Sequence, residues 1–199
     1  MTHIFYLMGK SASGKDSLYE RLMGDPSLAF IPLIPWTTRP MRDGETEGAE
    51  YHFTDEEGLK KLQEEGRVIE LRSYHTECGI WKYFTVAGDS QQGSGRDILG
   101  IGTLESFQKI REYYGRKRVI PLYIEVEDGI RLQRALKREM KPGNHRYEEM
   151  CRRFLADQQD FSQERLQAAG ILERFDNSGQ FEDCLKKVRS RILEVREGI

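Results

Sequence analysis

The stretch from Ile4 to Lys15 constrains the fold of this chain more than any other. It begins with an apolar run, Ile4–Met8, which has the length of one buried strand and stops at Gly9. Gly14-Lys15 follows, and then a pattern of apolar residues at helical spacing. A strand, a G-x-x-x-x-G-K loop and a helix form a phosphate-binding P-loop, in which backbone N–H groups, the helix N-terminus and the lysine all attract phosphate oxygens. The sequence therefore predicts a phosphate site at the end of a buried strand.

We predict that the residues of this loop contact the phosphates of a nucleotide; they are Gly9, Ser11, Ala12, Ser13, Gly14, Lys15, Asp16 and Ser17. Loops of this type usually carry Ser or Thr after the lysine, and its hydroxyl binds magnesium. Asp16 occupies that position here. Because Mg²⁺ prefers oxygen ligands and keeps several waters, we hypothesise that Asp16 positions the metal, directly or through water.

Strands and helices alternate along the rest of the chain, which indicates a parallel α/β sheet with its ligand at the carboxyl ends of the strands. Strands are expected at about 97–102, 119–126 and 171–177, although Pro121 is unusual in a central strand. Helices are expected at 103–115, capped by Thr103, at 128–140 and at 147–166. From Phe181 to Val195 apolar residues recur every three or four positions, which predicts a final helix that packs one face on the core.

Residues 34–86 interrupt this alternation with a small lobe of mixed character. A polar, turn-rich loop opens it, and a brief strand at 51–53 follows. Thr54 and Glu57 make a capping-box pattern for a helix that runs to about Glu65, and two strands, 67–74 and 80–86, turn at Glu77-Cys78-Gly79. We therefore expect one domain over 1–199, with a core of 1–33, 87–130 and 167–199, the lobe at 34–86 and a helical region at 131–166.

Two arginine-rich segments could bind phosphates or simply lie in solvent. Arg39 and Arg42 lie in the polar loop beside the rigid Pro40, and arginine binds phosphate in a bidentate fork. A solvated loop explains this pattern equally well. The two helices after residue 128 flank a break at Pro142-Gly143-Asn144 and carry many arginines. They form either a solvated pair of helices or a lid that closes over phosphates.

Composition excludes several classes of protein. The 199 residues carry a formal net charge of −2, which does not favour wrapping nucleic acid or binding an anionic membrane. No apolar run approaches the ~18 residues of a membrane span, and the start of the chain lacks the basic leader of a signal peptide. Cys78, Cys151 and Cys184 are widely spaced, and we interpret them as reduced thiols of a cytoplasmic protein.

The polar loop of the lobe resembles a motif of the guanylate kinase family. The family pattern is T-T-R-x-x-R-x-G-E, followed by G and Y-x-F, and this chain reads Thr37-Thr38-Arg39-Pro40-Met41-Arg42-Asp43-Gly44-Glu45, then Gly48 and Tyr51-His52-Phe53. The similarity extends through Val68-Ile69-Glu70 to Tyr83-Phe84-Thr85, and more loosely to Arg153-Phe154 and Asp176-Asn177. The resemblance implies a P-loop kinase core, a lobe that binds a nucleoside monophosphate (NMP) and a helical lid.

The resemblance also implies roles for individual residues. In the acceptor site, the positions around the substrate phosphate are matched by Thr38, Arg39, Arg42, Tyr51 and Tyr83. Glu70 matches the carboxylate that accepts hydrogen bonds from guanine N1 and from the guanine amino group. Thr85 matches the hydroxyl that contacts guanine O6. The expected catalytic residues are Lys15, Arg39, Arg42 and the lid arginines Arg138 and Arg153, and Asn177 is expected to contact ATP. Considered without the family, Tyr51 could belong to the core and Glu70 could be a charge on the solvent side of a strand.

The chain departs from the family pattern at three positions besides Asp16. Gly100 and Gly102 stand where the family carries an acidic pair, one member of which helps to organise magnesium or the guanosine. Phe84 replaces a glycine, which we expect to narrow the backbone approach beside the base. These departures bear on the rate of the reaction and on the choice of base.

The resemblance implies an enzyme that phosphorylates a nucleoside monophosphate, with GMP or dGMP as the expected acceptor, ATP as the donor and Mg²⁺ as the cofactor. Two alternatives stay open at this stage. The chain could be a guanylate-kinase-like binding module that has lost catalysis, or a kinase for a different phosphorylated acceptor. The expected partners are small nucleotides, without nucleic acid, membrane or an obligate protein partner.

Overall fold

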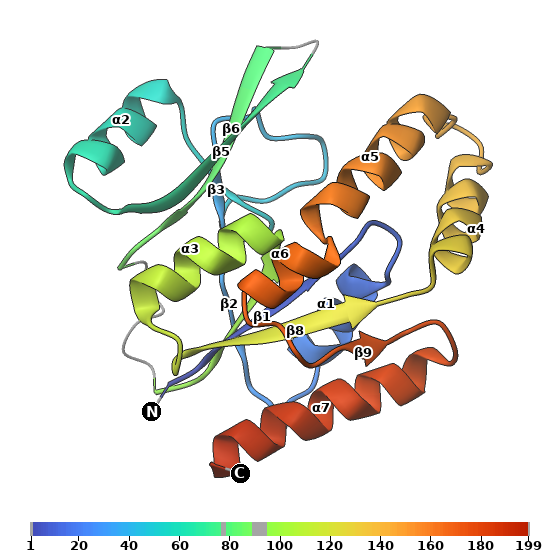
Figure 1. Ribbon diagram of the computed structural model, residues 1–199. Helices are drawn as coiled ribbons and strands as arrows, with labels where there is room; N and C mark the ends of the chain where they lie inside the picture. Colours follow the sequence, from blue (N-terminus) through green and yellow to red (C-terminus); the bar gives the residue numbers. More distant parts are fainter. Residues whose placement is uncertain (1, 77–78, 89–94, 199) are drawn as a thin grey trace.

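The computed structural model describes residues 2–76, 79–88 and 95–198, and these residues form two sheets (Figure 1). The core sheet has five parallel strands in the order β2-β7-β1-β8-β9. Its strands are β1 (Ile4–Gly9), β2 (Ile31–Pro32), β7 (Ile98–Gly102), β8 (Val119–Glu125) and β9 (Phe175–Asp176). The predicted fold class, a parallel α/β core flanked by helices, is confirmed.

Helices cover both faces of the core sheet. On one face lie α1 (Lys15–Met23) and α7 (Phe181–Glu197), which pack with Phe5 and Leu7 of β1. On the other face lie α3 (Leu104–Tyr114) and α6 (Gln163–Ala168), which pack with Tyr6 and Met8. The alternation along β1 follows from strand geometry, because successive side chains point to opposite faces. Both faces of the central strand are therefore buried, and its carboxyl end delivers the chain to the P-loop.

The second sheet belongs to the inserted segment and has the order β4-β3-β6-β5. Its strands are β3 (Trp36–Thr37), β4 (His52–Phe53), β5 (Val68–Thr76) and β6 (Gly79–Val86), and its one helix in the described chain is α2 (Glu56–Glu64). Leu59 and Leu62 of α2 pack against Phe84 and Leu71, so the helix covers one face of this sheet. The opposite face is left for polar side chains.

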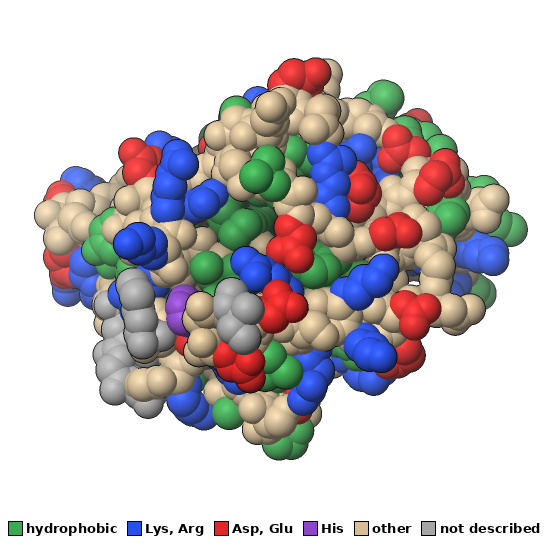
Figure 2. Space-filling view, turned by 60° about the horizontal axis from the view of Figure 1, so that its bottom comes forward, with side chains coloured by type: hydrophobic (Ala, Val, Ile, Leu, Met, Phe, Trp, Pro, Cys, Tyr) green, Lys and Arg blue, Asp and Glu red, His purple; other side chains and the backbone are tan. Residues whose placement is uncertain are grey.

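A helical hairpin completes the molecule. It consists of α4 (Asp128–Glu139), which follows β8 directly, and α5 (Tyr147–Asp160). In Figure 1 this hairpin stands at the upper right and the inserted lobe at the upper left, with the core below them. Charged side chains of both signs are interspersed over the face seen in Figure 2, as the near-neutral net charge leads one to expect.

Two predicted helix boundaries are wrong. The N-cap of α2 is Asp55, whose carboxylate accepts a hydrogen bond from the Gly58 N–H, and not the Thr54 of the apparent capping box. The predicted helix 147–166 is two helices, because the chain breaks at Phe161 and Ser162. Phe161 leaves the helix to stack on Tyr123 in the core, and Ser162 then caps α6.

The last core strand is also shorter than predicted. Only Phe175–Asp176 pairs with β8, because Ile171 is buried among the residues of α3 and α6 instead of extending the sheet. This short partner explains why β8 tolerates Pro121. Pairing with β9 begins at Ile124, so in the described chain Pro121 has a neighbouring strand only on the β1 side.

Some sequence predictions lie outside the described residues. The predicted turn at Glu77-Cys78-Gly79 belongs to this group, since residues 77 and 78 are not described, and residues 89–94 are likewise not described. Among the described cysteines, Cys151 is exposed and Cys184 is buried, and both are free thiols. None of the helices in the described ranges is long and apolar enough to span a membrane.

Candidate functional site

The P-loop joins β1 to α1 through a turn that needs small residues. A Cβ on Gly9 would lie 2.6 Å from the Ile124 carbonyl oxygen and 2.8 Å from Ser13 Oγ, so the loop passes too close to β8 for any side chain. Gly14 has a φ of +84°, and Ala12 also has a positive φ of 61°. Left-handed backbone at a non-glycine residue is uncommon and clusters at binding loops. The predicted loop therefore adopts a compact, strained turn at the N-terminus of α1.

The side chain of Asn177 supports the backbone of this loop. Its Nδ2 donates a hydrogen bond of 2.8 Å to the Ser13 carbonyl, and a Cβ on Gly14 would lie 2.6 Å from the same nitrogen. The Asn177 side chain is buried, and its own backbone N–H bonds the Glu125 carbonyl at the end of β8. The sequence predicts that Asn177 contacts ATP; the structure places it beneath the loop, where it positions the backbone.

The first turn of α1 carries the charged residues of the loop. Lys15 Nζ lies 3.2 Å from Asp16 Oδ2, and both Asp16 and Ser17 are exposed. In the described residues no three His, Cys, Asp or Glu side chains gather as a preformed metal site. Asp16 is therefore a single carboxylate that lies open to solvent beside the lysine of the loop.

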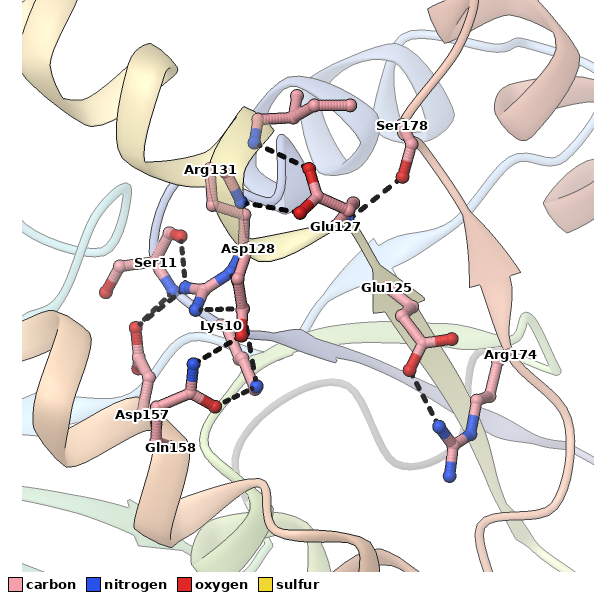
Figure 3. A network of polar contacts seen from close by, with 12 residues as sticks. Lys10, Ser11, Glu125, Glu127, Asp128, Arg131, Asp157, Gln158, Arg174 and Ser178 are labelled. Atoms are coloured by element: carbon pink, nitrogen blue, oxygen red, sulfur yellow. Dashed lines mark hydrogen bonds and ion pairs between the residues drawn. The ribbon is translucent and has the colours of Figure 1, made fainter.

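A buried arginine that the sequence prediction missed connects the hairpin to the P-loop (Figure 3). Arg131 of α4 is 1% exposed, and its Nη1 donates to the Ser11 carbonyl at 3.0 Å. It also forms ion pairs with Asp128 at 2.7 Å and with Asp157 at 3.4 Å. Asp157, from α5, in turn accepts a 2.7 Å hydrogen bond from the Ser11 N–H. The N–H and the carbonyl of Ser11 are thus both hydrogen-bonded to side chains of the hairpin.

Lys10 extends the same network. Its Nζ donates to Gln158 Oε1 at 2.6 Å and lies 3.7 Å from Asp128 Oδ1, while Gln158 Nε2 donates to Asp128 Oδ2 at 2.5 Å (Figure 3). A cavity of about 360 Å³ opens beside these groups, between the carboxyl ends of β8 and β9. Asp128 and Arg131 lie three residues apart on one face of α4, and this spacing is the sequence signal from which their ion pair could have been predicted.

The predicted lid arginines lie on the hairpin and pair with its own acids. Arg138 Nε donates to Glu139 Oε1 at 3.1 Å, and Arg153 Nε donates to Glu149 Oε1 at 2.8 Å. Both side chains are about half exposed, at 47% and 56% accessibility. Arg134, in contrast, donates to the Asn177 carbonyl at 2.9 Å under the loop. The two predicted arginines therefore lie in solvent on the hairpin, and within the described ranges their ion pairs are with acids of the hairpin and not with the P-loop.

In the inserted lobe, Arg39 is buried and paired with Glu45. Its Nη1 and Nη2 each donate to a Glu45 oxygen at 2.7 Å, and its guanidinium lies over the rings of Tyr51 and Phe53 at 5.1 and 5.5 Å. Hydrogen bonding to Arg39 lowers the pKa of Glu45 to about 2. The pKa of Arg39 is raised by Glu45 and also by the neighbouring Tyr83. Glu45, which the sequence prediction gave no role, thus occupies the fork that was predicted to hold a phosphate.

Arg42 lies over the same face of the sheet. Its guanidinium is 5.8 Å from the centre of the Trp81 ring, two residues along β6 from Tyr83, and its backbone N–H bonds Glu45 at 2.8 Å. A cavity of about 510 Å³ lies between this loop and the start of α2. Thr38 lines this cavity, and its hydroxyl accepts the Lys82 N–H at 3.1 Å, which leaves its O–H available to a ligand.

Glu70 and Thr85 face one another across β5 and β6. Thr85 Oγ1 donates to Glu70 Oε1 at 2.8 Å, and Arg72 donates to both Glu70 oxygens, from Nε at 3.0 Å and from Nη2 at 3.4 Å. In the antiparallel register Glu70 pairs with Thr85 and Arg72 with Tyr83, so all four side chains share the face opposite α2. Glu70 is therefore a buried, paired carboxylate rather than a charge on the solvent side.

The space over the two core glycines is filled by Tyr6. A Cβ on Gly100 would lie 2.7 Å from the Tyr6 ring, and one on Gly102 would overlap the Tyr6 hydroxyl. Burial raises the pKa of Tyr6, an effect that Ser106 of α3 partly offsets. The prediction for Phe84 is not supported, because its ring is fully buried in the cluster against α2 and points away from Glu70.

A family model described as guanylate kinase matches residues 1–194 of the chain. The chain belongs to the guanylate kinase family. A guanylate kinase of Bdellovibrio bacteriovorus is 29% identical over 109 residues, which are 53% of this chain and 58% of that protein. One of Oleidesulfovibrio alaskensis is 31% identical over 137 residues, 67% of this chain and 63% of that protein. The chain thus spans less than two thirds of these relatives.

The fold of this guanylate kinase family member is also found among solved structures. The crystal structure of guanylate kinase from Anaplasma phagocytophilum superimposes with a TM-score of 0.60 and covers 99% of this chain and 86% of its own. Sequence identity in that alignment is 20%, so the comparison establishes the shared fold. Membership of the family agrees with the resemblance seen in the polar loop of the lobe.

Proposed function

We propose that the chain transfers the γ-phosphoryl group of ATP to the phosphate of a nucleoside monophosphate, with GMP or dGMP as acceptor. The observation that carries this proposal is the position of Tyr6. Its side chain lies close enough to Glu70 and Arg72 of the lobe to interact with them electrostatically, and Gly9 of the P-loop follows three residues later on the same strand. The phosphate loop and the polar face of the lobe therefore both adjoin the carboxyl half of β1, which supports a site that holds donor and acceptor next to one another.

In this scheme the P-loop and Lys15 bind the donor phosphates. In a loop of this type backbone N–H groups bind phosphate oxygens, and the N-terminus of α1 adds a partial positive charge. Arg39, Arg42, Tyr51 and Tyr83 hold the acceptor phosphate, since they lie over one face of the lobe sheet. An incoming phosphate competes with Glu45 for the fork of Arg39, so substrate binding must displace or share that carboxylate.

The protein has little covalent chemistry to perform. The acceptor phosphate is already an anion, so no general base is required, and catalysis rests on positioning and on stabilising the charge that develops on the transferred group. Arg138 and Arg153 reach that group only if the hairpin moves toward the lobe, because both now lie in solvent on its surface. Closure of the lobe and the lid also excludes water, which would otherwise hydrolyse ATP.

Magnesium fits the charged groups of this site. Mg²⁺ is usually held by one or two carboxylates together with substrate phosphates and waters rather than by a protein cage. Asp16 offers one exposed carboxylate beside Lys15. When bound, the ion would neutralise charge on the donor phosphates. We therefore keep Asp16 as the residue that would hold it, directly or through water.

A coupled assay of ADP release tests the function. We expect wild-type protein to release ADP with GMP and dGMP and to release less with the other nucleoside and deoxynucleoside monophosphates. Lys15→Ala should lower turnover by about 100-fold or more, as when one group that stabilises the transition state is removed, with an unchanged circular dichroism spectrum. Lys60→Ala is the matched control, because Lys60 is an exposed lysine of α2 with 75% of its side chain accessible.

The same assay separates the alternatives. Binding of GMP without ADP release would identify a module that has lost catalysis, and turnover with only a different acceptor would identify another kinase. Equal turnover of GMP by Lys15→Ala and wild type would contradict the scheme. The expectation that the chain works in the cytoplasm with nucleotides as its only partners stays a prediction.

A further inference from the structure

Arg72 is a partly buried cation, and the only role given to it so far is its bond to Glu70. It lies on β5 with 16% of its side chain accessible, and it shares its face of the sheet with Tyr83, across from it on β6. Burying a charge is costly unless the charge has partners. The arrangement of its five N–H donors shows what further partner would suit it.

Arg72 uses one edge of its guanidinium and leaves the other edge unused. Nε and one hydrogen of Nη2 face the two oxygens of Glu70, at 3.0 and 3.4 Å. Within the described part of the chain, Nη1 donates to no protein acceptor and is not among the buried unpaired atoms, so it stays accessible. The outer edge, Nη1 with the second hydrogen of Nη2, can therefore donate two parallel hydrogen bonds to a ligand.

Thr85 cannot supply the donor that a base carbonyl needs. A threonine hydroxyl has a single O–H, and in this structure Thr85 directs it at Glu70 Oε1 over 2.8 Å. The hydroxyl is also buried, with the residue 3% exposed. A carbonyl oxygen of a bound base would thus meet a lone pair of Thr85 instead of a hydrogen. Another donor has to satisfy that oxygen, and the outer edge of Arg72, which is already bonded to Glu70 through its other edge, offers one on this face.

Glu70 keeps room for one further donor. An ionised carboxylate has about four acceptor positions, and three of them are used by Thr85 and the two Arg72 bonds. Tyr6 closes the floor of the site, because its ring fills the space over Gly100 and its hydroxyl the space at Gly102. In the described residues that floor brings a neutral hydroxyl rather than a second carboxylate. The subsite therefore presents one acceptor, on Glu70, beside two charged donors, on Arg72.

We propose that Arg72 is a specificity-determining residue that donates to O6 and N7 of guanine while Glu70 accepts from N1. This inference rests on the proposed function, because it assumes a purine nucleotide as acceptor. Guanine carries the N1 donor next to the O6 and N7 acceptors, and arginine binds that O6/N7 edge in a bidentate manner in nucleic-acid recognition. Adenine presents an amino group where Arg72 requires an acceptor and a bare N1 where Glu70 requires a donor, so both contacts become repulsive.

Calorimetric binding of GMP and 7-deaza-GMP tests the assignment. The analogue differs from GMP only in lacking the N7 acceptor. Wild type should bind 7-deaza-GMP about three- to tenfold more weakly than GMP, the value of one hydrogen bond, whereas Arg72→Ala should bind both equally. Arg72→Ala should also lose about 5- to 150-fold in affinity for GMP, which is the value of one bidentate contact. Arg189→Ala is the control, because Arg189 pairs with Asp25 at 3.0 Å on the core and should keep the wild-type ratio.

Loss of stability does not obscure this test. Arg72→Ala leaves Glu70 buried without its cation, which could unfold the lobe, so Arg72→Lys is measured in parallel. Lysine keeps the charge beside Glu70 but lacks the planar fork, and it should bind GMP and 7-deaza-GMP within about twofold of one another. Each ratio compares two ligands on the same protein, so a partly unfolded fraction affects both affinities alike.

The outcomes separate Arg72 from the proposed function. Equal affinity of wild type for GMP and 7-deaza-GMP, or an unchanged ratio in Arg72→Ala, would overturn the role of Arg72 and reduce it to holding Glu70 in place. Neither result would contradict the proposal that the protein phosphorylates GMP. If wild-type protein neither binds nor phosphorylates any guanine nucleotide, the proposed function itself is wrong, and the assignment of Arg72 to guanine fails with it.

Discussion

The hydroxyl of Tyr6 occupies the space into which any side chain at Gly102 would project. The two residues lie on neighbouring parallel strands, β1 and β7, where Tyr6 is paired with Gly100. The ring of Tyr6 covers Gly100 and its hydroxyl covers Gly102, so the aromatic residue and the two glycines form one packed unit. Side chains at positions 100 and 102 would need the space that Tyr6 occupies, so the lack of an acidic pair at these two positions is linked to this tyrosine.

This relationship predicts a specific rescue. Gly102→Ala should destabilise the protein by about 1–3 kcal/mol, the usual cost of adding atoms to a packed core. Tyr6→Phe removes the hydroxyl that Gly102→Ala would strike, so the double variant should recover most of this loss. Urea denaturation of the four proteins gives the coupling energy, which we expect to be between about 0.5 and 3 kcal/mol.

Gly100→Ala provides the control for that cycle. Its Cβ would meet the ring atom Cδ2 of Tyr6 at 2.7 Å rather than the hydroxyl, so Tyr6→Phe should not rescue it. Additive effects of Gly102→Ala and Tyr6→Phe would show that the hydroxyl does not limit this position.

The network around Arg131 predicts a strong dependence of the P-loop on one residue of the hairpin. Arg131→Met should cost about 3–5 kcal/mol of unfolding free energy, because it leaves the carboxylates of Asp128 and Asp157 without their buried cation. It also removes the donor to the Ser11 carbonyl, so affinity for ATP should fall as well. Thermal denaturation with and without ATP measures both effects.

An exposed ion pair supplies the comparison for Arg131. Arg165 pairs with Asp160 at 2.9 Å with both side chains about 60% accessible, and Arg165→Ala should cost at most about 1 kcal/mol. Similar losses for the two arginines would mean that burial does not strengthen the Arg131 network.

Part of the site could be read from the sequence because it depends on local order. The P-loop, its strand and its helix are contiguous, and the spacing of their residues alone predicts their geometry. Three lobe strands, at 51–53, 67–74 and 80–86, were predicted for the same reason, since alternation and turn residues are local signals. Trp36–Thr37 was assigned to the polar loop, and its pairing as β3 was missed. The break of the predicted helix at Phe161 was missed, because the stacking of that ring on Tyr123 is a tertiary contact that overrides helical periodicity.

The rest of the site depends on contacts between distant segments. Asn177 supports Ser13 from 164 positions away, and Arg131 binds Ser11 across 120 positions. Neither pairing leaves a periodic pattern in the sequence. The use of Thr85 as a donor to Glu70 is also a matter of register, because a shift of one residue between β5 and β6 would turn these side chains to opposite faces. Residue types were therefore predictable here, and their partners were not.

The Arg39–Glu45 pair predicts a loss of stability in acid. Hydrogen bonding to Arg39 lowers the pKa of Glu45 from an ordinary value of 4.5 to about 2. A carboxylate with a depressed pKa contributes stability that is fully present above its unfolded value and is lost as the pH falls through its folded value. The contribution of Glu45 should therefore vanish between about pH 4.5 and pH 2.

Denaturation of wild type and Glu45→Gln as a function of pH measures that contribution. The difference in unfolding free energy between the two proteins should be constant above about pH 5 and should become small near pH 2. Taking the difference removes the effect of other depressed carboxylates, among them Asp25, whose pKa is lowered to about 2 by Ser27 and Arg189. A difference that does not change with pH would mean that Glu45 acts by packing and not by charge.

Asp16 makes the sharpest prediction about the metal. If its carboxylate positions Mg²⁺, Asp16→Ser should raise the magnesium concentration needed for half-maximal turnover by about tenfold or more, the usual effect of removing a group that orients a bound metal. Asp16→Asn keeps an oxygen ligand without the charge and should lie between the two proteins. The exposure of Asp16 makes its effect on folding small, so all three should unfold at similar urea concentrations. If Asp16→Ser needs the same or a lower magnesium concentration for half-maximal turnover, the carboxylate of Asp16 does not position the ion. Lys15, the phosphates and the serine hydroxyl would then be sufficient.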